Sequence, residues 1–97
     1  DLQDKSLGEL TRVIRFLNEN SNIRIKIGGH TDDQGSASYN KQLSLLRARA
    51  VNDYLVANGI PSKRIEYAGF GQEMPAFPND SEANRSRNRR IEFEIID

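Results

Sequence analysis

The residues that could do chemistry are concentrated in one polar segment, residues 30–38, which reads His-Thr-Asp-Asp-Gln-Gly-Ser-Ala-Ser. Small and polar residues of this kind are typical of a loop. The side chains of Thr31, Asp32 and Asp33 could simply cap and turn the chain, as Asp and Thr often do. The carboxylates could instead belong to a ligand site. Residue types alone leave both roles open.

Arg47 is the second candidate, because helical spacing places its side chain on an apolar face. At about 100° per residue it lies within about 40° of Leu43. A guanidinium on a core-facing stripe loses hydration and needs an anionic partner. That partner could be Asp32 or Asp33 in a buried ion pair, or a ligand carboxylate bound through two hydrogen bonds. Asn40, seven residues earlier and on about the same face, could share the pocket.

A basic run stands before the end of the chain, with arginines at positions 85, 87, 89 and 90. Such runs usually form a solvated face or tie loops together. Nucleic-acid binding is not expected, because 14 Lys and Arg are balanced by 14 Asp and Glu and no basic and aromatic platform stands out.

An enzymatic or metal-dependent function finds little support in the residues. His30 is the only histidine, so a hydrolase would have to pair it with a serine such as Ser36 or Ser38, and no nucleophile-elbow motif is present. The segment lacks the alternating oxygen ligands of an EF-hand, and a zinc site would need more His or Cys, of which the chain has no Cys. We expect a non-enzymatic protein without a cofactor, in which His30 is structural.

The hydrophobic periodicity indicates which elements position these residues. Apolar residues at helical spacing predict a first helix that starts near residue 6 and ends near the run from Asn18 to Asn22, and a second helix that ends before Gly59. Alternating apolar residues predict strands at 23–29, 64–71 and 91–95, with a long loop before the last. The residues that carry the helical pattern are Leu7, Leu10, Ile14 and Leu17, then Leu43, Leu46, Ala50, Val51, Tyr54 and Leu55.

This order of elements predicts a single α/β domain over residues 1–97. We expect a two-layer α/β sandwich with a mixed sheet and helices on one face, in which the second helix crosses over between two parallel strands. The polar segment would then lie at the C-terminal ends of the parallel strands, where ligand sites tend to form. Because no strand precedes the first helix and no initiator Met is present, we expect a fragment of a longer protein that has lost its first strand.

Four ordered motifs carry a resemblance to a known family. They are Gly29-His30-Thr31-Asp32 with Gly35; Tyr39-Asn40, Leu43-Ser44 and Arg47-Ala48; Gly69-Phe70-Gly71; and Asn79, Arg85 and Asn88-Arg89-Arg90. Over roughly residues 5–96 the chain resembles the OmpA-like, or OmpA/MotB C-terminal, peptidoglycan-binding domain of outer-membrane proteins, peptidoglycan-associated lipoproteins and flagellar stators. It departs from that pattern at Gly28, where many relatives have an acidic residue.

The resemblance implies non-covalent binding of peptidoglycan through the meso-diaminopimelate of its stem peptide, which carries an ammonium and a carboxylate. Asp32 would take the ammonium and Arg47 the carboxylate. The remaining implied ligand-binding residues are Thr31 and Asn40, which would orient the ligand, and Arg85 and Arg89, which would border or brace the site. The resemblance also implies a periplasmic module of a Gram-negative cell envelope, tethered to the outer membrane only through missing parts of its parent protein. A domain that binds an envelope protein on the same scaffold is the alternative.

Overall fold

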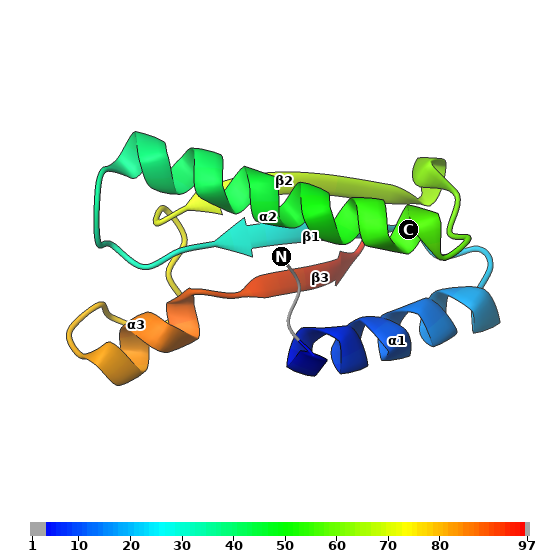
Figure 1. Ribbon diagram of the computed structural model, residues 1–97, viewed down its shortest axis with the longest axis horizontal. Coiled ribbons are helices and arrows are strands. Elements are labelled where there is room, and N and C mark those ends of the chain that lie inside the picture. Colours follow the sequence, from blue (N-terminus) through cyan, green and yellow to red (C-terminus); the bar gives the residue numbers. More distant parts are fainter. Residues whose placement is uncertain (1–3, 97) are drawn as a thin grey trace.

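The computed structural model describes the backbone of residues 4–96 and the side chains from residue 8 onward. Along the chain follow α1 (Asp4–Glu19), β1 (Ile25–His30), α2 (Ala37–Ala57), a short 3-10 turn (Ser62–Arg64), β2 (Ile65–Gly71), α3 (Glu82–Asn88) and β3 (Ile91–Ile95). Within the described residues β1 is the central strand of the sheet, parallel to β2 and antiparallel to β3 (Figure 1). The predicted mixed sheet is confirmed.

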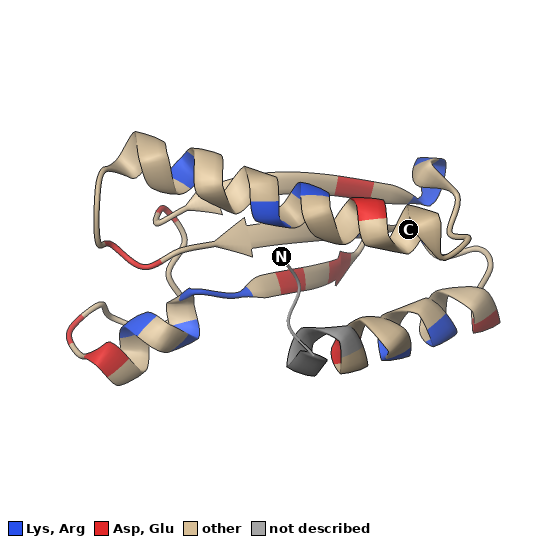
Figure 2. Cartoon of the chain, viewed as in Figure 1, with Lys and Arg blue, Asp and Glu red and all other residues tan. Residues whose placement is uncertain are grey.

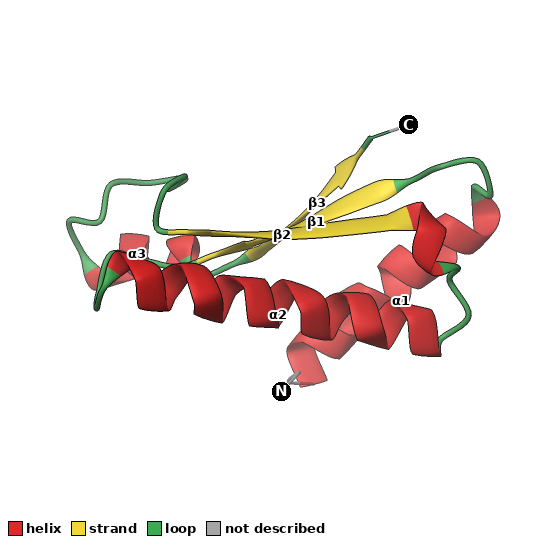
Figure 3. Ribbon diagram, turned by 90° about the horizontal axis from the view of Figure 1, so that it is seen from above, coloured by secondary structure: helices red, strands yellow, loops and turns green. Residues whose placement is uncertain are grey.

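The molecule has two layers, with α1 and α2 on the same face of the sheet (Figure 3). The core between the layers contains Leu10 and Leu17 from α1 and Ile25 and Ile27 from β1, all buried. Val51 and Leu55 of α2 complete it, and the predicted sandwich with helices on one face is confirmed. The predicted contribution of Leu7 lies outside the described side chains. In the described part of the chain, no helix is long and apolar enough to cross a membrane.

Two glycines allow α2 to lie directly on the sheet. A Cβ at Gly29 of β1 would lie 2.2 Å from the carbonyl oxygen of Ser44, and one at Gly69 of β2 would lie 2.4 Å from the backbone nitrogen of Leu45. Neither contact is sterically possible for a larger residue. The Ser44 hydroxyl also accepts a hydrogen bond from the N–H of Gly71 at 2.9 Å. These contacts hold the first half of α2 beside the C-terminal ends of β1 and β2.

The buried face of α2 agrees with the predicted hydrophobic pattern at Val51 and Leu55 but differs from it in the first half of the helix. The buried residues are Asn40, Ser44, Ala48, Val51 and Leu55. Leu46 is 54% exposed, Leu43 is only half-buried, and Arg47 is exposed. Because α2 approaches glycines, the part of its surface that contacts the sheet has to be small, and larger apolar residues are displaced to the flanks. The prediction that Arg47 lies on a core-facing stripe is therefore wrong.

The helix α3 is absent from the prediction, which assigned this region to a loop and a basic run. Ser81 caps it, because its hydroxyl accepts a hydrogen bond from the N–H of Asn84 at 3.1 Å. Seven residues are too few for a hydrophobic period to stand out. The fully buried side chain of Asn88 ties α3 to the preceding loop, accepting from the N–H groups of Ala76 and Phe77 and donating to Phe77 O and Asn79 Oδ1.

Candidate functional site

The predicted polar segment lies where β1 ends and α2 begins, with α3 at the same end of the molecule (Figure 1). The N–H of Thr31 donates to the carbonyl oxygen of Gly71 at 2.9 Å, which joins the loop to the end of β2. Ser36 caps α2 by accepting a hydrogen bond from the N–H of Tyr39 at 3.2 Å. His30 belongs to β1 and not to the loop, so the loop spans residues 31–36.

Asp32 is a buried carboxylate that already has two protein donors. Its Oδ1 accepts from the N–H of Gln34 at 2.9 Å and its Oδ2 accepts from Nη1 of Arg89 at 2.5 Å. Burial raises the pKa of Asp32, but the hydrogen bonds from Gln34 and Arg89, with the charges of Arg89 and Arg85, outweigh burial and leave the pKa below its usual value. Asp32 is thus an anion at neutral pH. Because each carboxylate oxygen has two lone-pair directions, it can still accept further donors.

Arg89 joins Asp32 to a second carboxylate, Glu82. Its Nη2 lies 2.7 Å from Glu82 Oε2, while Arg85 Nε lies 3.5 Å from Glu82 Oε1. Two of the three arginines predicted to bind the ligand, Arg85 and Arg89, therefore lie at this cluster. The prediction that the basic run ties loops together is confirmed for Arg89. Sequence reasoning missed Glu82. Its spacing of three and seven residues from the two arginines places all three on one helical face, but only once α3 is known.

Asn40 and Thr31 are both buried and support the backbone of the Asp32 loop. The amide nitrogen of Asn40 donates to Gln34 O at 2.8 Å, Gln72 Oε1 at 2.9 Å and Asp32 O at 3.3 Å. The Thr31 hydroxyl donates to the same Asp32 carbonyl at 2.9 Å. These contacts position the loop, and direct contact of either side chain with a ligand stays a prediction.

Arg47 is an exposed cation on α2 that has no hydrogen-bond or ion-pair partner among the described residues. The alternative of a buried ion pair with Asp32 or Asp33 is wrong, because the arginine that reaches Asp32 is Arg89. Arg47 lies seven residues after Asn40, about 10 Å along the helix axis and about 20° around it. It is therefore on the side of α2 that supports the Asp32 loop. Figure 2 shows acidic and basic residues of the loop, α2 and α3 at this end of the molecule.

His30 is buried against the opposite face of the sheet from α2. Its ring stacks on Phe70 with centroids 5.2 Å apart, and its Nε2 lies 3.6 Å from Glu92 Oε1. Burial and the charge of Arg90 lower the pKa of His30, while Glu92 raises it less. In the part of the chain that the structure describes, Nδ1 has no hydrogen-bond partner, so neither Ser36 nor Ser38 receives a hydrogen bond from this ring. Among the described residues, no group of three or more His, Asp and Glu could hold a metal ion.

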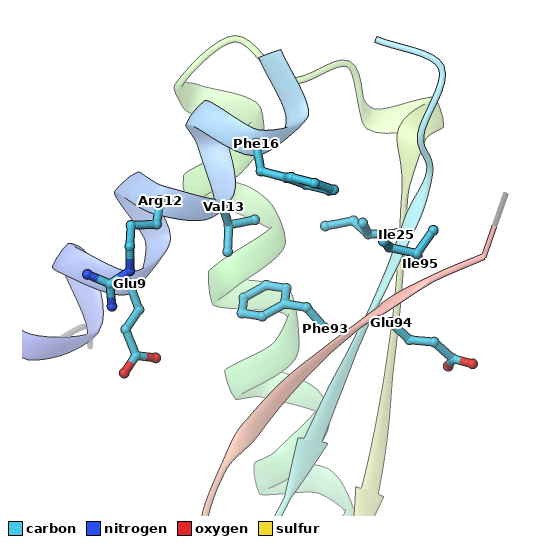
Figure 4. A pocket seen from close by; sticks show the side chains of 8 residues that line it. All are labelled: Glu9, Arg12, Val13, Phe16, Ile25, Phe93, Glu94 and Ile95. Atoms are coloured by element: carbon cyan, nitrogen blue, oxygen red, sulfur yellow. The ribbon is translucent and has the colours of Figure 1, made fainter. Parts of the chain in front are cut away.

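An apolar pocket of about 400 Å³ lies at the other end of the sheet, between α1 and β3 (Figure 4). Its apolar lining is Val13 and Phe16 of α1, Ile25 of β1, and Phe93 and Ile95 of β3, and the charged residues Glu9, Arg12 and Glu94 also line it. Ile95 is paired with Ile25 at the start of β1, whereas the Asp32 loop follows the end of that strand. The pocket is therefore separate from the charged site at the Asp32 loop.

A family model and curated relatives agree on the family of this chain. The model of the OmpA family matches residues 1–89. The chain is 35% identical over 92 residues to a peptidoglycan-associated lipoprotein of Legionella pneumophila, covering 95% of the chain and 52% of the lipoprotein. It is 33% identical over 94 residues to outer membrane porin F of Pseudomonas fluorescens, covering 97% of the chain and 29% of the porin. The chain thus spans about half or less of the length of these relatives.

A solved structure agrees with the sequence relatives. The peptidoglycan-associated lipoprotein of Burkholderia pseudomallei has a similar fold, with a TM-score of 0.90 and 30% sequence identity. The similarity covers 97% of this chain and 80% of the lipoprotein chain. The same scaffold therefore occurs in a protein whose name associates it with peptidoglycan.

Proposed function

Because the chain belongs to the OmpA family, we propose that it binds peptidoglycan without covalent chemistry and anchors an envelope component to the cell wall. The observation that carries this proposal is the arrangement of Asp32 and Arg47. An ionised carboxylate is fixed in a braced loop, while the neighbouring helix presents a guanidinium that has no partner in the described structure. The names of the lipoprotein relatives support the choice of polymer.

The ligand group that we propose is the meso-diaminopimelate of the stem peptide. Its free end carries an ammonium and a carboxylate on one carbon, and the ammonium would be received by Asp32 while the carboxylate binds Arg47. Opposite charges separated by a ligand-sized gap favour a zwitterion over a simple cation or anion, through matched attraction and mismatched repulsion. Thr31 and Asn40 would contribute by holding the loop, and Arg85 and Arg89 by bracing Asp32 from α3.

Such a site binds each ligand weakly. Charge-assisted hydrogen bonds contribute about 1.5–3 kcal/mol each, so two of them, about 3–6 kcal/mol together, correspond to dissociation constants of roughly tens of micromolar to several millimolar. Firm attachment would then depend on many copies engaging one wall polymer.

The proposed location is the periplasm of a Gram-negative bacterium, with the parent protein held at the outer membrane. Relatives named as an outer membrane porin and a peptidoglycan-associated lipoprotein support it. The attachment itself would be made by parts of the parent that are not in this sequence.

Sedimentation with purified peptidoglycan tests the proposal. Asp32→Asn and Arg47→Gln keep the shape of each side chain while removing its charge, and we expect each to weaken binding at least about tenfold, which corresponds to about 1.4 kcal/mol. Arg49→Gln is the matched control, because Arg49 is an exposed arginine on the same helix whose nearest partner is Asp53, 4.0 Å away. Wall binding that persists in both site variants at the control's level would contradict the proposal.

Binding of an envelope protein on the same scaffold is a second candidate. It is favoured by exposed apolar side chains near the charged site, namely Tyr39, Leu46, Met74 and Phe77. If that is the function, a partner will be captured by the Asp32→Asn variant as well as by the native protein, and wall fragments will be bound by neither.

A further inference from the structure

We propose that Glu82 is a positioning residue that keeps Asp32 receptive to an ammonium group by holding Arg89 between two carboxylates. This inference rests on the proposed function and adds to it a residue of α3 outside the four motifs of the family resemblance.

The geometry divides one guanidinium between two acids. Nη1 of Arg89 bonds Oδ2 of Asp32 at 2.5 Å, and Nη2 bonds Oε2 of Glu82 at 2.7 Å. A guanidinium can instead place two parallel N–H groups on a single carboxylate, which is its preferred mode of binding an isolated partner. Glu82 prevents that mode here, because it binds the second nitrogen of Arg89. Arg89 therefore occupies only one lone-pair direction on one carboxylate oxygen of Asp32.

The local charge follows from the same contacts. Glu82 also attracts Arg85, whose Nε lies 3.5 Å from Oε1. With Glu82 ionised, two carboxylates face two guanidinium groups, and Asp32 keeps attraction for an incoming cation. Without that charge, Asp32 alone would face both guanidinium groups, and their excess positive charge would repel an ammonium.

Glu82 acts through Arg89 and is not itself the ammonium site. Its side chain is 69% exposed, whereas that of Asp32 is 9% exposed, and an exposed carboxylate is screened by water and salt. The hydrogen bond and charge of Arg89 hold the pKa of Glu82 below its usual value, so Glu82 is ionised at neutral pH. The charge of Glu82 should accordingly have a modest effect on the affinity for a ligand at Asp32, and only when that ligand carries a positive charge.

The first experiment follows the Asp32 carboxyl carbon by NMR during a pH titration of Glu82→Gln. Loss of a nearby negative charge and closer approach of Arg89 both favour ionised Asp32, so we expect the pKa of Asp32 to fall further. If Glu82 only stabilised α3, its loss would release Arg89 and the pKa would rise toward the usual value, which overturns the proposal. An unchanged pKa overturns it too. Glu66→Gln is the control, because Glu66 pairs with Arg24 at 3.2 Å at the other end of the sheet.

The second experiment measures ligand selectivity. We expect Glu82→Gln to weaken binding of a diaminopimelate muropeptide by about two- to fivefold, as for an exposed ion pair. For the same muropeptide with its diaminopimelate amino group acetylated, we expect Glu82→Gln and the native protein to bind with the same affinity. The Glu66→Gln control should bind each of the two muropeptides as the native protein does. Equal weakening for both muropeptides, or none for either, contradicts the proposal. If the native protein binds no muropeptide, the proposed function fails, while the Asp32 titration still decides whether Glu82 controls Asp32.

Discussion

Replacement of Asn88 by Ala should destabilise the domain by an amount that the structure allows us to estimate. The Asn88 side chain is fully buried and makes four hydrogen bonds of 2.8–3.1 Å, three of them to the backbone of Ala76 and Phe77. At about 0.5–1.5 kcal/mol net for each bond, the network contributes roughly 2–6 kcal/mol. Because Ala76 and Phe77 are exposed, water can replace part of it. We therefore expect a loss of about 3 kcal/mol.

Urea unfolding followed by circular dichroism measures this loss. For a domain of this size about 3 kcal/mol also lowers the melting temperature by roughly 12–24 °C. Asn84→Ala is the matched control: it is the same substitution in the same helix, and it removes an exposed hydrogen bond to Asp80 Oδ1 of 2.8 Å. The control should change stability by no more than about 0.5 kcal/mol.

The comparison of the two variants can refute the reasoning. If Asn88→Ala loses less than about 1 kcal/mol, or no more than Asn84→Ala, then the Asn88 network does not hold the 72–80 loop on α3. The position of Arg89, which directly follows Asn88, would then need another explanation.

Two further predictions concern the scaffold. Gly29→Ala puts a Cβ 2.2 Å from Ser44 O. Since the backbone has to move, we expect a loss of about 3 kcal/mol in the free energy of unfolding, measured with urea. Gly8→Ala is the control, because nothing lies within 4 Å of a Cβ there, and equal stability of the two variants would contradict the close contact. Because burial lowers the pKa of His30 from its usual 6.5, the unfolded chain takes up a proton that the folded chain resists. The stability that neutral His30 contributes is thus present above pH 6.5 and lost as the pH falls below it. In His30→Gln the urea midpoint should therefore change less with pH between about pH 7.5 and 5.5 than in the native protein. The same pH dependence in both proteins would contradict this prediction.

Much of the fold could be predicted because its strands show clear alternation. Ile25 and Ile27 are buried and alternate with polar or small residues, and the strands containing Ile65 and Phe93 were located in the same way. The parallel pairing of β1 and β2 followed from the long helix between them. The boundary of β1 was placed too early, because Ile23 continues the alternation but lies before the strand.

The packing of α2 could not be predicted from hydrophobicity, because the surface that contacts the sheet is selected for small size. Ser44 and Ala48 are buried where α2 meets glycines, while Leu46 is exposed. Arg47 stands out because it has no partner among the described residues, and not because it is buried as its helical position indicated. Its expected role came from the family motif.

The partner of Asp32 could not be predicted from the sequence either. Asp32 and Arg89 are 57 residues apart, and their contact depends on α3, which is too short for periodicity to indicate. Two features of the sequence indicate this helix: Ser81 as its N-cap, and the three-residue spacing of Glu82 and Arg85.

Titration of the isotopically labelled domain with meso-diaminopimelate, followed by backbone amide NMR, tests the central claim most directly. The account predicts shifts in residues 31–47 and 82–89 for the native domain, and their loss in Asp32→Asn and in Arg47→Gln but not in Arg49→Gln. Shifts that persist in both site variants, or that occur only outside these two segments, would contradict it.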